Sequence, residues 1–179
     1  MPERVQPLIS ADRIGHRVRE LGAEITRDYA GRSLFLVCVR KGSFVFAADR
    51  ARAIDLPLHV DFLGVRSYGQ GTETSGVVQI TQDLSQPIAQ SDVLLVEDII
   101  DTGLTIGHLM RLLSTRGPAS VRVCALLHKP ARARVASHID YLGFTVEDRF
   151  LVGYGLDFAE RYRNLPYVGI LDGTSDASS

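Results

Sequence analysis

The chain carries little net charge and contains no long apolar run. Its 20 basic and 21 acidic residues give a formal net charge of −1, so no strong global field would attract nucleic acid or an anionic membrane. No apolar stretch approaches the roughly 18 residues that a membrane-spanning helix needs, and the opening segment, MPERVQPLIS, lacks the apolar core of a signal peptide. We therefore expect no nucleic-acid partner, no membrane insertion and no export.

Cysteine is also scarce, since the sequence contains only Cys38 and Cys124. Each lies inside an apolar run, LFLVCV and VRVCALL, where a buried free thiol is far commoner than a disulfide. Buried free thiols fit a reducing compartment. We therefore expect the protein to be cytoplasmic.

The 179 residues, 45% of them hydrophobic, are enough to bury one sizeable core. No internal repeat, linker or low-complexity tract divides the chain, so residues 1–179 are expected to form a single domain. Within it, residues 128–170 contain short apolar pieces separated by Gly and Asp, and we expect them to form most of a small hood beside the core. Residues 172–179, DGTSDASS, are predicted to be a flexible tail.

The spacing of apolar residues predicts a mixed α/β fold. Helical spacing after Ser10, a suitable N-cap, predicts a first helix over residues 11–30 that ends near Gly31. The run LFLVCV is apolar enough to be a strand covered on both faces. The strand–helix–strand order over residues 93–127 implies a right-handed parallel crossover. The other predicted elements are helices at 43–54 and 105–114 and strands at 34–39, 58–65, 76–84 and 121–127.

Three carboxylates gather at the end of the strand in VLLVEDIIDTGLTI, residues 93–106. In an open parallel sheet, ligands bind beyond the carboxyl ends of the strands. Glu97, Asp98 and Asp101 would repel one another there unless cations, water or hydroxyl groups compensate their charge. The sequence therefore indicates that something polar is held at this point.

The residues that follow, DTGLT, have the features of a phosphate cradle. Gly103 allows close approach of the backbone, Thr102 and Thr105 offer hydroxyl groups, and the amides open a helix. A ribose 5-phosphate, with hydroxyls at one end and a phosphate at the other, would satisfy both halves. The alternative is a solvated acidic turn with an ordinary helix cap. Any single residue of the motif favours that alternative, whereas the complete ordered string favours a ligand site.

The string VLLVEDIIDTGLTI resembles the phosphoribosyl pyrophosphate signature of the type I phosphoribosyltransferases, and its VEDIIDTG form resembles their hypoxanthine-guanine branch. The resemblance implies a parallel-sheet core flanked by helices, with a small C-terminal hood over the base. It also implies purine salvage, in which the 5-phosphoribosyl group passes from phosphoribosyl pyrophosphate to hypoxanthine or guanine with loss of pyrophosphate. A xanthine-preferring relative and an RNA-binding regulator of the same fold are the alternatives. The resemblance further covers residues 37–50, 60–71, 126–134 and 150–169.

The resemblance assigns roles to the residues of the signature. Asp101 is implied to be the general base that accepts the proton of the purine. Glu97 and Asp98 are implied to meet the ribose hydroxyls and a Mg²⁺ ion, directly or through water, and Asp157 is a third candidate ligand of that ion. The implied ribose-phosphate site comprises Glu97, Asp98, Asp101, Thr102, Gly103, Leu104 and Thr105.

Lys41, Gly42 and Arg163 are implied to bind pyrophosphate, and a cis peptide bond is implied between Arg40 and Lys41. From the residues alone, RKGS is an ordinary turn. In the same way, RYR around Arg163 equally fits an exposed helix face. The pyrophosphate assignment therefore depends on the resemblance.

The implied purine site consists of Lys129 at the exocyclic oxygen, Phe150 as a stacking face, Leu151 through its backbone, and Asp157. Each has a plainer alternative, since Phe is more often a core residue and Lys is more often solvated.

Ser67 and Tyr68 match a loop that closes over the reacting groups in this family, although residues 66–76 alone read as a mobile hairpin. The implied partners are small-molecule substrates and further copies of the chain, in a homodimer or homotetramer.

Overall fold

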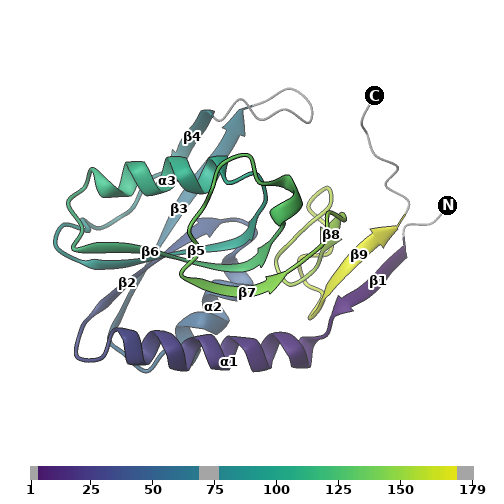
Figure 1. The fold of residues 1–179 in the computed structure, drawn as a ribbon, viewed down its shortest axis with the longest axis horizontal. Coiled ribbons are helices and arrows are strands. Elements are labelled where there is room, and N and C mark those ends of the chain that lie inside the picture. Colours follow the sequence, from purple (N-terminus) through teal and green to yellow (C-terminus); the bar gives the residue numbers. More distant parts are fainter. Residues whose placement is uncertain (1–3, 69–76, 173–179) are drawn as a thin grey trace.

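A computed structural model describes residues 4–68 and 77–172, which form two sheets and three α-helices (Figure 1). The larger sheet has six strands, and all of its neighbours pair in parallel except β3 and β4, which are antiparallel. The prediction of an α/β fold around a parallel sheet is confirmed. In sheet order the strands are β4 (Val77–Gln82), β3 (Leu58–Tyr68), β2 (Leu34–Arg40), β5 (Asp92–Ile100), β6 (Ser120–His128) and β7 (Tyr141–Thr145).

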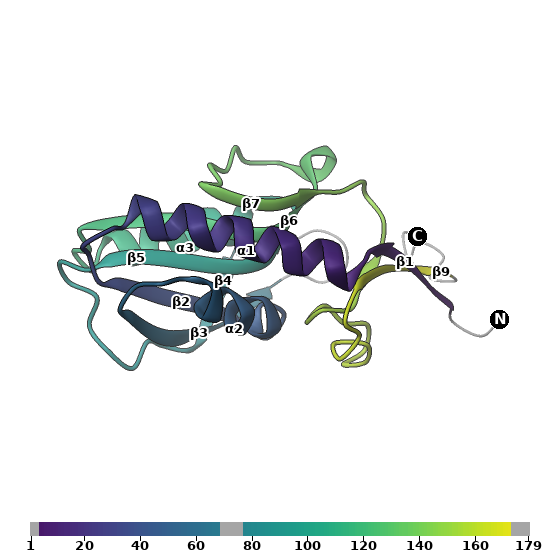
Figure 2. The same cartoon turned by 90° about the horizontal axis from the view of Figure 1, so that it is seen from below.

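Helices cover both faces of this sheet. α1 (Ala11–Asp28) and α2 (Phe44–Ala53) pack on one face, and α3 (Leu104–Ser114) packs on the other (Figures 1 and 2). Alternate strand residues enter the two hydrophobic layers: Leu36 lies in the layer beneath α1 and α2, and Val37 lies in the layer beneath α3. Strand β2 is therefore buried on both sides, as its apolar run predicted. Of the described helices, none has the length and apolarity required to cross a membrane.

Helix α1 begins as the sequence predicted. The hydroxyl of Ser10 accepts a hydrogen bond from the Arg13 amide at 3.3 Å, which satisfies one of the free donors at the helix start. The helix ends at Asp28, two residues before the predicted end at 30, and Gly31 adopts φ +76° in the turn that follows. That conformation favours glycine, so the sequence located the turn correctly.

A second, three-stranded antiparallel sheet joins the two ends of the described chain. Strand β1 (Arg4–Ile9) pairs with β9 (Val168–Asp172), and β9 pairs with β8 (Leu151–Val152). Figure 2 shows β1 and β9 beyond the first turn of α1. The small sheet therefore uses an N-terminal strand in addition to the C-terminal segment, whereas β7, which lies inside the range expected for the hood, joins the main sheet. The single-domain organisation stays a prediction, and most of the predicted tail lies outside the described residues.

Cys38 and Cys124 are both free and buried. Burial raises the pKa of the Cys38 thiol to about 12 and that of Cys124 to about 11. Both side chains therefore behave as small apolar core residues. The prediction of buried free thiols is confirmed.

We expect Leu94→Ala to lower the free energy of unfolding by about 2–5 kcal/mol, because Leu94 is fully buried in the layer beneath α1 and α2 and its truncation leaves a cavity. Urea denaturation followed by circular dichroism measures the change. Val135→Ala, which truncates a 40% exposed side chain, is the control and should stay within about 0.5 kcal/mol of the unaltered protein. Equal losses in both variants would contradict the core assignment.

Candidate active site

The polar groups of the site follow three neighbouring strands. Lys41 follows β2, Asp101 follows β5 and Lys129 follows β6, and these strands pair in parallel in the order β2–β5–β6. The Lys129 amide donates a hydrogen bond to the Ile100 carbonyl at 3.0 Å, so the ends of β5 and β6 stay together. The three residues therefore emerge at one edge of the sheet, where parallel sheets bind ligands.

Strand β5 is longer than its apolar run suggested, because its pairing with β6 continues to Ile100 and His128. Glu97 and Asp98 are therefore inside the strand and not beyond it. Consecutive strand residues point to opposite faces of a sheet. Glu97 lies on the α3 side and Asp98 lies against Gly42, so these two carboxylates face opposite sides of the strand, while Glu97 and Asp101 line one cavity.

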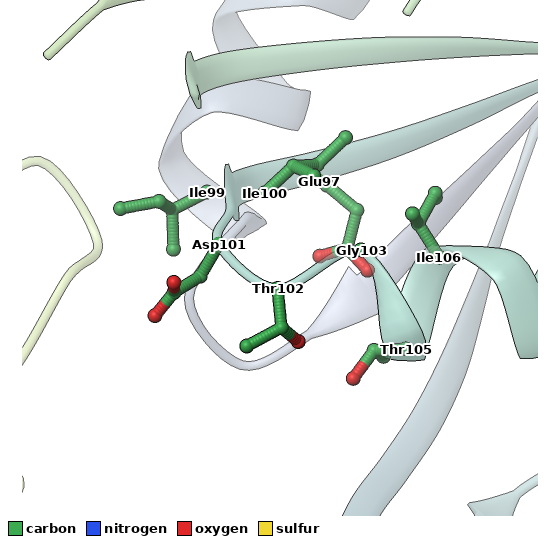
Figure 3. Close-up of a pocket in the computed structure, with 8 residues that line it drawn as sticks. All are labelled: Glu97, Ile99, Ile100, Asp101, Thr102, Gly103, Thr105 and Ile106. Atoms are coloured by element: carbon green, nitrogen blue, oxygen red, sulfur yellow. The ribbon is translucent and has the colours of Figure 1, made fainter. Parts of the chain in front are cut away.

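Glu97 lines a small cavity of about 80 Å³ beside the first turn of α3. Figure 3 shows its carboxylate behind the loop, and it shows Asp101, Thr102 and Thr105 extending to one side of that loop. Glu97 is only 6% exposed, and none of the described residues donates a hydrogen bond to its carboxylate. Burial raises the pKa of Glu97 well above its ordinary value, and the charge of Asp98 adds to the effect. A cation or a hydroxyl donor at this point would relieve an unfavourable charge.

Asp98 is held against the turn that follows β2. Its carboxylate accepts the Ile99 amide at 2.9 Å, while burial raises the pKa of the side chain. A Cβ atom placed on Gly42 would lie 1.6 Å from Asp98 Oδ2, so only glycine leaves room for the carboxylate in this position. The peptide bond between Arg40 and Lys41 is cis, as the resemblance implied.

The loop between β5 and α3 has the form of an anion-binding helix start. Gly103 adopts φ +82° at the N-cap of α3, and the Leu104 amide donates a long hydrogen bond of 3.4 Å to the Thr102 hydroxyl. The Thr102 carbonyl accepts the amides of Arg134 and Val135 at 3.0 and 3.1 Å, which packs the loop against a neighbouring segment. The first turn therefore presents backbone amides that an anion can use.

Asp101 and Lys129 are joined by a chain of charged side chains that the sequence did not predict. Arg132 Nε lies 2.9 Å from Asp101 Oδ1, although the N–H is not aimed at that oxygen, so the contact is ionic and no hydrogen bond forms. Arg132 Nη1 and Lys129 Nζ both lie 3.6 Å from Asp148 Oδ1. Arg132 belongs to the single turn η1 (Pro130–Arg132), and its spacing three residues after Lys129 was the available signal.

A second charged group connects the hood to the turn after β2. Arg163 Nη2 lies 2.9 Å from Asp157 Oδ1 and 3.3 Å from Glu160 Oε2, and Lys41 Nζ lies 3.3 Å from Glu160 Oε1. Arg163 Nη1 also donates to the Gly155 carbonyl at 2.8 Å. The structure therefore brings together Lys41, Asp157 and Arg163, and it adds Glu160, which no sequence pattern predicted.

Lys129 is not a solvated lysine and Phe150 is not a core phenylalanine, which were the alternatives to a binding role. Lys129 is 8% exposed, so it is not a solvated lysine, and Phe150 is 45% exposed, so it is not a core residue. The Phe150 ring packs edge-on against Phe158 at 5.5 Å, which leaves part of its surface open. Leu151 is buried in β8, where only its backbone is available to a ligand.

The loop that was expected to close over the site lies largely outside the described residues. Ser67 and Tyr68 are the last residues of β3, and nothing is described from there to Val77. The role of this loop stays a prediction.

Comparison with known proteins identifies the family. Residues 10–159 match the model of the phosphoribosyl transferase domain. A hypoxanthine-guanine phosphoribosyltransferase of Mycobacterium avium is 48% identical over 92% of this chain and 84% of its own length. The chain belongs to the hypoxanthine-guanine phosphoribosyltransferase family.

Two further relatives extend this result. The crystal structure of a hypoxanthine-guanine phosphoribosyltransferase from Bacillus anthracis superposes with a TM-score of 0.90 at 42% identity, over 93% of this chain and 99% of that one. The bifunctional protein TilS/HprT of Listeria innocua is 50% identical over 92% of this chain, which spans only 25% of that longer protein. The fold and the arrangement of its strands are therefore those of this phosphoribosyltransferase family.

We expect Glu97→Gln to raise the free energy of unfolding of the ligand-free phosphoribosyltransferase by about 1 kcal/mol or more at pH 7.5, because it removes a buried charge that has no hydrogen-bond donor among residues 4–68 and 77–172. The raised pKa means that the folded state binds this proton more readily than the unfolded state does. The gain should therefore shrink as the pH falls through the raised value toward 4.5, the ordinary value.

Urea denaturation at several pH values measures this difference. Glu147→Gln removes an exposed carboxylate and is the matched control, expected to change stability by less than about 0.5 kcal/mol. A Glu97→Gln variant that is less stable than the unaltered protein at pH 7.5 would show that the charge has a partner.

Proposed function

We propose that this chain transfers the 5-phosphoribosyl group from phosphoribosyl pyrophosphate to hypoxanthine or guanine in purine salvage, giving IMP or GMP and pyrophosphate. The observation that carries the proposal is the meeting of Lys41, Asp101 and Lys129 at the ends of three adjacent strands. Lys41 offers an exposed ammonium group, Asp101 a carboxylate and Lys129 a buried ammonium group. They lie near the start of α3, which we propose to bind the 5-phosphate. No observation favours a xanthine-preferring relative or an RNA-binding regulator.

The 5-phosphate would bind at the start of α3. The amides of Gly103, Leu104 and Thr105 and the hydroxyls of Thr102 and Thr105 are suited to phosphate oxygens, and the Leu104 amide would exchange its 3.4 Å hydrogen bond to the Thr102 hydroxyl for one to the phosphate. The positive end of the helix dipole adds to the attraction. The ribose would then lie toward Glu97 and Asp98.

A Mg²⁺ ion fits the acidic residues near this end of the site. Glu97 and Asp98 are carboxylates with raised pKa values, and a cation would compensate their buried charge. Among residues 4–68 and 77–172, no three His, Cys, Asp or Glu side chains are close enough to hold a metal by themselves. Mg²⁺ commonly uses one or two carboxylates together with water and substrate phosphates, which suits this arrangement, and Asp157 is a third candidate ligand. When bound, the ion would neutralise charge on the departing pyrophosphate.

Asp101 would accept the proton of the purine nitrogen as that nitrogen attacks the sugar. Its ion pair with Arg132 at 2.9 Å holds the carboxylate at the exit of β5. Positioning of this kind places a general base within reach of the proton that it must take.

The purine would lie between the ends of β5 and β6 and the hood. Lys129 would donate to the oxygen at the 6-position, and Phe150 offers an exposed aromatic face for stacking. The backbone of Leu151 would supply a further contact, and Asp157, paired with Arg163, lies at the boundary with the pyrophosphate site.

Self-association as a homodimer or homotetramer is part of the proposal. Val60 and Phe62 lie on the same face of β3 and are 49% and 40% exposed. Paired apolar residues on a strand surface favour contact with a second copy. A cytoplasmic location is likewise proposed, and the two free thiols support it.

The direct test is a spectrophotometric assay with phosphoribosyl pyrophosphate, Mg²⁺ and a panel of hypoxanthine, guanine, xanthine and adenine. Turnover of hypoxanthine and guanine supports the proposal. Activity with xanthine alone would favour the xanthine-preferring relative. If none of the four bases is converted, the enzymatic assignment is wrong.

Asp101→Asn should lower turnover by roughly 10²- to 10⁴-fold, the usual worth of a general base, while binding of phosphoribosyl pyrophosphate should survive. Steady-state kinetics and equilibrium binding measure the two effects. Asp83→Asn changes an exposed aspartate that pairs with Arg116, and it serves as the control. Turnover equal to that of the unaltered enzyme, in a folded Asp101→Asn variant, would remove Asp101 from the mechanism.

Lys129→Gln should weaken the use of hypoxanthine and guanine and narrow the gap to adenine. An ammonium group only donates hydrogen bonds, so it suits a carbonyl at the 6-position and rejects the amino group of adenine, whereas an amide can donate or accept. The ratio of kcat/KM for hypoxanthine to that for adenine measures the effect. Arg19→Gln, at an exposed position in α1, should leave the ratio unchanged. An unchanged ratio in Lys129→Gln would show that this lysine does not select the base.

A further inference from the structure

Glu160 forms ion pairs with the two cationic side chains that the proposed function assigns to pyrophosphate. Its Oε1 lies 3.3 Å from Lys41 Nζ and its Oε2 lies 3.3 Å from Arg163 Nη2. Lys41 follows β2 and Arg163 belongs to the hood segment, so one carboxylate bridges two parts of the chain. Hydrogen bonds from Lys41 and Arg163 lower the pKa of Glu160, which keeps it ionised.

These three side chains line the same cavity, whose volume is about 440 Å³. Its described lining includes four cationic residues and a single acidic residue, Glu160. A space with this excess of positive charge attracts a polyanion. The cationic residues of the lining are Arg40, Lys41, Arg66 and Arg163.

The backbone around Glu160 is held in an uncommon conformation. Ala159, Glu160 and Tyr162 have φ values of +50°, +62° and +76°, in the left-handed region that side-chain-bearing residues seldom adopt. The Glu160 amide donates to Asp157 Oδ2 at 2.9 Å, which ties this turn to the acid beside Arg163. Such conformations concentrate at functional sites, where the surrounding structure maintains them.

The two ion pairs of Glu160 are poorly suited to a purely structural role. The side chains of Lys41 and Glu160 are 61% and 65% exposed, and that of Arg163 is 19% exposed. Because Glu160 is exposed in both pairs, solvent screens them and they contribute little to stability. A glutamate carries one negative charge, whereas pyrophosphate carries several and would compete well for the same two cations. Because the Glu160 side chain is exposed, it has room to move into solvent when the ligand arrives.

We propose that Glu160 is an internal counter-ion of the pyrophosphate site. It pairs with Lys41 and Arg163 when the site is free, is displaced by pyrophosphate, and thereby weakens the binding of pyrophosphate. The inference rests on the proposed function, since that function places pyrophosphate at Lys41 and Arg163. Its consequence is a faster release of the product pyrophosphate.

The test is the dissociation constant of Mg²⁺-pyrophosphate for the ligand-free enzyme, measured by isothermal titration calorimetry. Glu160→Gln keeps the size of the side chain and removes its charge, so the dissociation constant should fall on the order of 3- to 10-fold. The inhibition constant of pyrophosphate against phosphoribosyl pyrophosphate should fall by the same factor. If Glu160→Gln does not fold, Glu160→Gly replaces it, because glycine readily adopts the observed φ.

Two further variants separate the possible results. Glu20→Gln removes an exposed carboxylate that pairs with Arg17 on α1, away from the cavity, and should leave the dissociation constant unchanged. Lys41→Met should weaken binding at least 10-fold. If Lys41→Met weakens binding but Glu160→Gln does not tighten it, the counter-ion role is wrong and the proposed function stands. If Lys41→Met has no effect either, pyrophosphate does not bind here and the site itself is misassigned.

Discussion

The parallel hydrogen bonding of β2, β5 and β6 determines where Lys41, Asp101 and Lys129 lie. The register pairs Cys38 with Val96 and Val96 with Cys124, so the three strands run side by side and end at one edge. Strands β2 and β6 are followed by lysines, Lys41 and Lys129, and β5 is followed by Asp101. A slip of one residue would turn every side chain to the other face, and Glu97 would leave the α3 side. The apolar residues that fill both layers of the sheet therefore hold the chemistry in place as well as the fold.

The charges of the cleft are arranged so that most cations already have acidic partners within the chain. Arg132 and Lys129 share Asp148, while Arg163 and Lys41 share Glu160. Glu97 differs from these paired residues, because it is a buried carboxylate without a hydrogen-bond donor among the described residues. An unpaired buried charge is unfavourable. The Glu97 carboxylate therefore lowers the stability of the ligand-free protein, and a bound ligand with its cation would offset this cost.

The sequence predicted the central layers of the fold well, because two-sided burial leaves an unmistakable apolar run such as LFLVCV in β2. It did not predict β1, since that strand pairs on one side only and is mostly exposed, which leaves no alternation to read. The candidate residues were found through the ordered motif around Asp101. Arg132 and Glu160 were not predicted, because their importance comes from contacts with Asp101 and Lys41 that only the tertiary structure brings together.

The pairing of β1 with β9 joins residues near opposite ends of the described chain, with Arg4 opposite Asp172. During synthesis the strands of the main sheet emerge before β9 does, because β9 is the last strand of the described chain. Loop closure over such a separation is slow compared with local pairing. The strands of the main sheet can thus pair before β1 can pair with β9. The hood segment with Asp157 and Arg163 is anchored at its C-terminal side only after β9 has been synthesised.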